Sequence, residues 1–114
     1  MPRPAEIAMF VDDVEACRRF YEAVLGSPPD QSWPGGCIFR AGGLDILLHE
    51  RYVPGEDDLP CENHFAFAVE ELESFCEQLR NSGLRIEYAP RDYPWGRSAY
   101  LRDPVGQLVE LKQV

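Results

Sequence analysis

The sequence predicts an α+β fold in which two tandem βαβββ modules form a cupped mixed sheet with the helices on its outer face. The pattern of one strand, one helix and then three strands occurs twice in the 114 residues. When the chain is shifted so that Ala8 meets Ala66, Val11 also meets Val69. The shared order of all five elements, more than these identities, indicates an internal repeat.

The first module opens with an alternating pattern and continues with a helical one. Glu6–Val11 alternates bulky apolar residues with others, which predicts a strand with one side facing the core. Asp12, with Glu15 three positions later, matches the outline of an N-terminal capping box. We therefore expect a helix from about Val14 to Leu25, ended by Gly26.

Three further strands and a linker complete the first half. Ser27–Gly36 is turn-rich with room for a short edge strand, whereas Cys37–Arg40 and Leu44–Glu50 are expected to pair as a hairpin. Arg51–Cys61 contains Pro-Gly and three consecutive acidic residues, which is typical of a linker. We expect a single domain over residues 1–114, with module one over about 4–51, the linker over about 52–61 and module two over about 62–114.

The second half repeats these elements. His64–Val69 predicts a strand, and the apolar spacing after Glu70 predicts a helix that ends at Gly83. The remaining expectations are a strand over Arg85–Tyr88, a turn-rich passage over Ala89–Gly96, and hairpin strands over Ser98–Arg102 and Gln107–Gln113. Asp-Pro-Val-Gly joins the hairpin strands, because Pro and Gly meet the dihedral requirements of such a turn.

The composition argues against several classes of partner. The chain has 20 acidic and 11 basic residues and a net charge of -9. Nucleic acid binding needs clustered cations, so no nucleic acid partner is expected. The apolar runs are far too short to cross a bilayer, and the N-terminus lacks the pattern of a secretion signal. We therefore expect no membrane partner and a cytoplasmic protein.

One side of the predicted sheet carries small and ionisable side chains. In the first strand of each module, the side opposite the core holds Glu6, Ala8 and Phe10 in one module, and His64, Ala66 and Ala68 in the other. In the last strand, a period of two places Glu110 on one face with Leu108 and Lys112. Small side chains beside ionisable groups leave space above a sheet, which suits a small ligand.

Glu6, His64 and Glu110 supply two carboxylates and one imidazole, which are suitable ligands for a divalent metal. Their wide separation along the chain does not itself establish convergence, and each residue has an alternative role. Glu6 also fits a solvated terminus, and His64 a capped surface imidazole. Glu110 also fits an ion pair with Arg97 or Arg102.

Several stretches give the chain a resemblance to a known family. The first helix ends in Phe-Tyr followed by Leu-Gly, within Phe20–Gly26, and the last hairpin has Asp-Pro-x-Gly-x-x-x-Glu-Leu over Asp103–Leu111. Together with His64–Val69, these motifs resemble the vicinal oxygen chelate superfamily, which comprises glyoxalase I, bleomycin resistance proteins, fosfomycin resistance proteins and extradiol dioxygenases. The resemblance covers nearly the whole chain. It implies paired βαβββ modules around a cupped site, commonly completed in a homodimer.

In metal-using members of that superfamily, four strands supply ligands. The matching positions on this chain are Glu6, an apolar residue of Ile46–Leu48, His64 and Glu110. The resemblance therefore implies a divalent ion (Ni, Zn, Mn or Fe) held by the three polar residues. Glu6 departs from the usual His or Gln, and the fourth-strand carboxylate of glyoxalase I is missing. His49 and Glu50 lie just beyond that position and would replace it only with a shifted strand register.

The resemblance leaves two functions open. The first, which we favour, is a lyase- or dioxygenase-like metal enzyme that acts on a small oxygenated substrate, with Glu110 as a catalytic residue. The second is a metal-free protein that sequesters a small aromatic or cationic compound, as bleomycin resistance proteins do. Pro94–Arg97 is similar to those proteins, and the expected ligand-binding residues are Trp33, Phe39, Trp95 and Arg97. Packing in the core or at an interface is the alternative for each ring.

Overall fold

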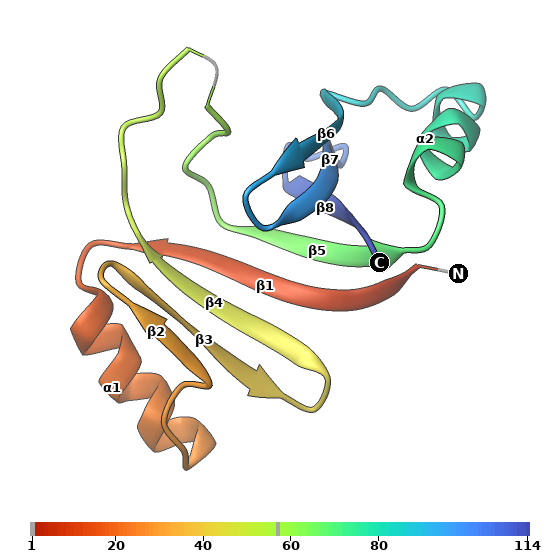
Figure 1. Ribbon diagram of the computed structural model, residues 1–114. Helices are drawn as coiled ribbons and strands as arrows, with labels where there is room; N and C mark the ends of the chain where they lie inside the picture. Colours follow the sequence, from red (N-terminus) through yellow and green to blue (C-terminus); the bar gives the residue numbers. More distant parts are fainter. Residues whose placement is uncertain (1, 57) are drawn as a thin grey trace. The chain divides into compact units, whose positions relative to one another are not determined.

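The computed structural model describes residues 2–56 and 58–114, and each half of the chain has the predicted βαβββ order (Figure 1). The first half contains β1 (Arg3–Val11), α1 (Val14–Leu25), β2 (Gln31–Trp33), β3 (Gly36–Ala41) and β4 (Leu44–Glu50). The second half contains β5 (His64–Val69), α2 (Leu72–Asn81), β6 (Tyr88–Tyr93), β7 (Gly96–Arg102) and β8 (Leu108–Gln113). The predicted α+β class is confirmed.

The chain divides into two compact units. The first unit comprises Glu6–Asn63, and the second comprises the residues up to Ala5 together with His64–Val114. The chain therefore passes between the units twice, at the Ala5–Glu6 bond and at the Asn63–His64 bond. The predicted linker belongs to the first unit, and its residue Asp57 lies outside the described residues.

The first unit contains a mixed sheet with α1 on one face. Its strand order is β2-β3-β4-β1, in which β1 and β4 are parallel and the other neighbours are antiparallel. Buried Cys37, Phe39 and Leu48 form the core beneath α1. Because side chains alternate along a strand, Glu6 and Leu47 lie on the face that points away from the helix.

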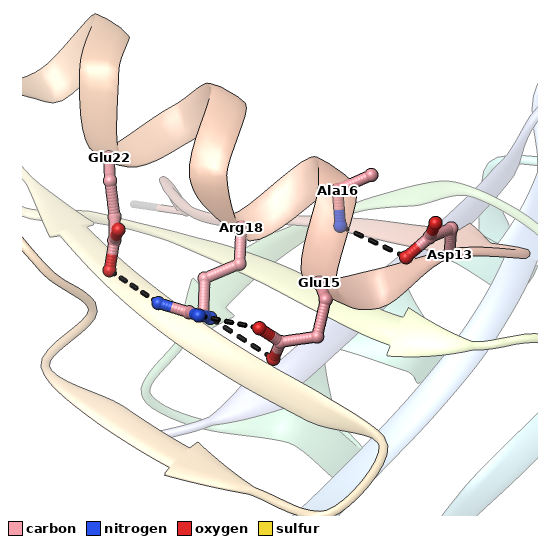
Figure 2. Close-up of polar contacts among 5 residues, drawn as sticks. All are labelled: Asp13, Glu15, Ala16, Arg18 and Glu22. Atoms are coloured by element: carbon pink, nitrogen blue, oxygen red, sulfur yellow. Dashed lines mark hydrogen bonds and ion pairs between the residues drawn. The ribbon is translucent and has the colours of Figure 1, made fainter.

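Helix α1 has the predicted bounds, but a different residue caps it. Asp13 is the N-cap, and its Oδ1 atom accepts a hydrogen bond of 3.0 Å from the Ala16 amide (Figure 2). The predicted capping box at Asp12 is wrong, because the Glu15 carboxylate extends along the helix to an arginine and does not return to the cap. Gly26, with φ of 78°, adopts the left-handed conformation that ends the helix.

Charged side chains form a ladder along the surface of α1 (Figure 2). The Nη1 atom of Arg18 lies 2.7 Å from Oε1 of Glu22, and its Nη2 atom lies 2.5 Å from Oε2 of Glu15. Pairs at this spacing support a helix locally, so α1 needs few buried residues of its own. In the described part of the chain, no helix has the length and apolar character needed to span a membrane.

The second unit repeats the arrangement around α2. Its strand order is β5-β8-β7-β6, in which β5 and β8 are parallel and the other neighbours are antiparallel. Leu72 and Cys76 of α2 are buried against Val69, Ala99 and Leu111 of the sheet. Apolar residues of one parity therefore cover the helix side, which leaves the other side of the sheet to residues of the opposite parity.

The prediction for the strand after α2 is wrong. The sequence predicts Arg85–Tyr88, whereas β6 occupies Tyr88–Tyr93, in the passage expected to be turn-rich. Pro90 weakens the strand signal there, because proline cannot donate a backbone hydrogen bond. The strand forms nonetheless, since β6 is at the edge of its sheet and its pairing is irregular between Tyr88 and Arg91. Edges and bulges are the places where a sheet accommodates proline.

Candidate metal and ligand site

The face of the second unit that points away from α2 carries polar and aromatic side chains. Ala99 and Leu111 pack toward α2, so Tyr100 and Glu110, next to them in sequence, lie on the opposite face. Tyr100 of β7 is directly across from Glu110 of β8, and Ala66 of β5 is across from Glu110 on its other side. Glu110 is therefore in the interior of the sheet, between paired strands.

His64 and Glu110 form a buried pair on this face. The Nε2 atom of His64 lies 3.1 Å from Oε1 of Glu110, and the side chains are 9% and 2% exposed. An ionised carboxylate only accepts hydrogen bonds, so the proton in this bond is carried by Nε2. Carboxylates are rarely buried unless they are paired or bind a metal, which makes the pair a candidate functional site.

Ser98 holds the second oxygen of Glu110. Its hydroxyl donates a hydrogen bond of 2.8 Å to Oε2, and Ser98 is itself completely buried. Burial by itself raises the pKa of Glu110, but the hydrogen bonds from His64 and Ser98 outweigh burial and leave the pKa below its ordinary value. Glu110 is therefore ionised at neutral pH and fixed in orientation, as a metal ligand or a proton acceptor needs to be.

Tyrosine rings line one side of the pair. The buried Tyr100 ring meets the His64 ring edge-on, with 5.8 Å between centroids. Tyr88 and Tyr93 of β6 each meet Tyr100 edge-on, at 5.9 Å and 6.0 Å. Burial raises the pKa of Tyr93, and the charge of Glu110 raises it further. The Tyr93 hydroxyl therefore keeps its proton at neutral pH, although the ionised carboxylate of Glu110 is nearby.

Glu6, the third predicted ligand, belongs to the first unit. It is 8% exposed and is paired with Asp45 in the ladder between β1 and β4. Leu47, two residues further along β4, lies on the same face as Glu6, so the fourth-strand ligand position is apolar. The structure thus brings His64 and Glu110 together within one unit. Glu6 is the first residue of the other unit.

In the observed pairing of β4 with β1, His49 lies on the face of the first unit's sheet that points away from α1. It is paired with Phe10, and the two ring centroids are 5.5 Å apart. It is two residues from Leu47 and therefore on the same face, next to the expected fourth-strand position, which Leu47 occupies. Its Nδ1 atom lies 2.7 Å from the carbonyl oxygen of Glu50. Because a carbonyl only accepts, the proton in this hydrogen bond is carried by Nδ1.

The four residues expected to contact a ligand fall into two groups. Phe39, which is 1% exposed, lies in the core beneath α1, and Arg97 makes an ion pair with Glu73 of α2. These placements favour structural roles for both. Trp33 and Trp95 are 37% and 54% exposed, so their rings are accessible to solvent. Ligand binding by Trp33 and Trp95, which the resemblance implies, therefore remains a proposal.

Sequence reasoning missed Ser98, Tyr88 and Tyr93. A signal for Ser98 was present: once the Asp103–Gly106 turn sets the hairpin register, alternation puts Ser98 on the same face as Glu110. No comparable signal exists for the two tyrosines, because the irregular pairing of β6 changes which residues face which side.

The donor atoms of this pair suit a divalent ion. One imidazole nitrogen and one ionised carboxylate are ligands that zinc, manganese, iron and nickel accept. The Ser98 hydroxyl behind Glu110 resembles the outer hydrogen bonds that orient carboxylate ligands in metal sites. Coordination through Nε2 of His64 would replace its hydrogen bond to Glu110, so the two states are alternatives for the same atoms.

Fold and site together define a protein of two βαβββ modules with a buried imidazole–carboxylate pair. The chain belongs to the Glyoxalase/Bleomycin resistance protein/Dioxygenase superfamily, because the sequence model of that family matches residues 3–111. The resemblance stated from the sequence is thereby confirmed. Anthracycline biosynthesis protein DauV from Streptomyces sp. (strain C5) is 30% identical over 118 residues, which cover 94% of this chain and 41% of DauV. The chain therefore spans less than half the length of that relative.

Two solved structures have the same fold. A glyoxalase/bleomycin resistance protein/dioxygenase superfamily member from Vibrio splendidus 12B01 has a TM-score of 0.75 and 17% identity, with 100% of both chains covered. Methylmalonyl-CoA epimerase from Mycobacterium tuberculosis has a TM-score of 0.71 and 18% identity, with 96% of this chain and 86% of the epimerase covered. At these identities the likeness establishes the fold and leaves the activity to the site.

Proposed function

We propose that the chain is a metal-dependent enzyme, lyase- or dioxygenase-like, that acts on a small oxygenated substrate. The observation that carries the proposal is the buried pair of His64 and Glu110, whose Nε2 and Oε1 atoms are 3.1 Å apart. Both side chains project from paired strands, β5 and β8, so their donor atoms are held on rigid elements. Nickel, zinc, manganese and iron are the candidate ions, since they accept mixed nitrogen and oxygen ligands.

Glu6 is the proposed third ligand. The chain passes between its two units at Ala5–Glu6 and again at Asn63–His64. Glu6 lies in β1, the first strand of its module, just as His64 lies in β5, the first strand of the other module. Its carboxylate is buried and faces away from α1. These features support Glu6 as the residue that joins the pair.

A divalent ion at these residues would polarise a substrate oxygen and stabilise negative charge that develops there. Glu110 is the proposed catalytic residue, because its carboxylate is ionised and can accept a proton from a substrate carbon at Oε1. Ser98 fixes Oε2 and thereby the plane of the carboxylate. The edge-on contact with Tyr100 restrains the ring of His64.

Metal content is the direct test. Protein purified without chelator, and protein incubated separately with nickel, zinc, manganese and iron salts, is desalted and analysed for bound metal. We expect about one ion per chain in the wild type and at least about a tenfold loss of affinity in His64→Ala, because an imidazole ligand is removed.

His49→Ala is the matched control, because His49 and His64 are the two histidines of the chain. Its metal content should equal that of the wild type. A wild-type protein that binds none of the four ions, or an equal loss in both histidine variants, contradicts the proposed metal site.

A second function is favoured by one observation on the same sheet. Trp95 is 54% exposed and stacks on Tyr93, with ring centroids 4.8 Å apart and planes 6° apart. An exposed ring held flat by stacking suits a protein that sequesters a small aromatic or cationic compound without a metal. Binding of such a compound with equal affinity before and after chelator treatment would favour this function over the enzyme.

We also propose that the protein acts as a cytoplasmic homodimer whose partner is a small molecule. The family resemblance supports the dimer, and the net charge of -9 argues against a nucleic acid partner. Light scattering on the purified chain over a range of concentrations tests the oligomeric state. A strict monomer would contradict the dimer and would require the site to be complete within one chain.

A further inference from the structure

We propose that Arg91 recognises an oxyanion, either a carboxylate or a phosphate, on the ligand of this site. The inference rests on the proposed function, because it concerns what the same sheet face selects. Arg91 is exposed and lies in β6, the edge strand that the sequence did not predict. Its position follows from the irregular pairing of that strand.

The bulge in β6 turns Arg91 toward the face of the sheet that points away from α2, which carries His64 and Glu110. Tyr88 is paired with Tyr100 and Arg91 with Ser98, so β6 takes three steps where β7 takes two. Without the extra residue, alternation would place Arg91 on the α2 side of the sheet. With it, Arg91 shares the face that holds the Ser98–Glu110 hydrogen bond.

A fixed ring holds the guanidinium of Arg91. Its Cζ atom lies 4.8 Å from the centroid of the Tyr93 ring, within the range of a cation–π contact. Tyr93 is itself restrained, because it stacks on Trp95 and meets Tyr100 edge-on. A guanidinium in such a contact still has N–H donors that can bind a planar acceptor.

Among the residues that the structure describes, Arg91 differs from most arginines because no acidic side chain pairs with it. Ion pairs are made by Arg18, Arg40, Arg51, Arg80, Arg97 and Arg102. Over residues 2–56 and 58–114, no carboxylate lies within ion-pair distance of Arg91, although the chain has 20 acidic residues. A restrained guanidinium without a carboxylate is suited to bind an anion from solution.

The position of Arg91 sets the size of the ligand. Strands β6, β7 and β8 are consecutive, so the backbone of Arg91 lies two strand spacings, about 10 Å, from the strand of Glu110. Because the arginine side chain is long, the distance that a ligand must span between the guanidinium and Glu110 is shorter than this backbone distance. We infer a compound whose oxyanion is separated by a few bonds from the oxygen atoms that meet His64 and Glu110.

Three probes with the same ring but different charge test the inference. Benzoate, phenyl phosphate and benzyl alcohol are each titrated into the protein by calorimetry. We expect one or both anions to bind at least about tenfold more tightly than benzyl alcohol, and Arg91→Gln to lose about tenfold of that affinity, because a charge-assisted hydrogen-bond pair is removed. The anion affinity of Arg91→Lys should lie between those of the wild type and Arg91→Gln, because lysine keeps the positive charge but cannot donate two parallel hydrogen bonds. The tighter anion distinguishes a carboxylate from a phosphate.

Arg85→Gln is the matched control, because Arg85 is exposed and lies outside the helices and strands. It should bind the probes as the wild type does. Metal content, measured on the same variants, separates this inference from the proposed function: anion affinity lost in Arg91→Gln with metal content unchanged supports the role of Arg91, even if no ion is bound. Failure of the wild type to bind either anion, equal binding of benzyl alcohol, or equal affinity in Arg91→Gln overturns it.

Discussion

The Ser98 hydroxyl donates a 2.8 Å hydrogen bond to Oε2 of Glu110, between residues that are 0% and 2% exposed. The two residues are diagonal neighbours in the pairing of β7 with β8. His64 contacts the other oxygen, Oε1. The carboxylate thus has a partner on each oxygen, and these two bonds keep it ionised although it is buried.

Ser98→Ala should destabilise the protein most at neutral pH. The variant leaves a buried, ionised oxygen without a partner, which costs about 1–3 kcal/mol of unfolding free energy. The pKa of Glu110 in the folded protein lies below its ordinary value of 4.5. Between the two values the unfolded chain binds more protons, so acid favours unfolding. The stabilisation is therefore present above pH 4.5 and is lost as pH falls through the folded pKa.

Urea unfolding of the wild type and Ser98→Ala, from about pH 7 down into this acidic range, measures the effect. The difference in unfolding free energy should shrink as the pH falls. Ser27→Ala, at an exposed position after α1, is the control and should change stability little at any pH. A difference that stays constant with pH would show that the Ser98 bond is not tied to the ionised form of Glu110.

The parts of this site that the sequence predicts are those with a local signal. Helix α1 has its predicted bounds, Val14 to Leu25, because helical spacing and the terminal Gly26 agree. Alternation along β8 likewise places Glu110 on the face opposite the helix. Each of these statements needs only neighbours in sequence or a single turn.

The remaining features depend on contacts between distant segments. The approach of His64 to Glu110 requires the parallel pairing of β5 with β8, which no local pattern specifies. Strand β6 was missed because Pro90 argues against a strand, while its place at an edge beside β7 allows one. The orientation of Arg91 then follows from the irregular pairing, which is a property of two strands together.

Asp13→Ala should weaken α1 more than Asp12→Ala does. Asp13 accepts a hydrogen bond from the Ala16 amide, and loss of such a cap costs about 0.5–2 kcal/mol. Asp12 is instead in an ion pair with Arg51 between exposed side chains, and pairs of this kind contribute about 1 kcal/mol or less. Thermal unfolding of both variants measures the contrast. A larger loss of stability in Asp12→Ala than in Asp13→Ala would instead support the capping box predicted from the sequence.

Phe39→Ala should destabilise the fold much more than Trp33→Ala. Phe39 is 1% exposed beneath α1, and removal of a buried phenylalanine ring costs about 3–5 kcal/mol. Trp33 is 37% exposed, so a smaller part of its ring is removed from water in the folded protein. Urea unfolding compares the two. Lost ligand affinity in Phe39→Ala without lost stability would instead support the stacking role expected from the resemblance.

A bound ion should raise the melting temperature of the wild type but not of Glu110→Gln. A ligand that binds only the folded state stabilises it, by about 2.7 kcal/mol when its concentration is a hundred times Kd. Glutamine keeps the size of Glu110 and an acceptor for the Ser98 hydroxyl, but it removes the charge that draws the ion. Glu56→Gln, at an exposed position, is the control and should show the same shift as the wild type. Thermal scans with and without each metal salt measure the shift, and an equal shift in Glu110→Gln would place the ion elsewhere.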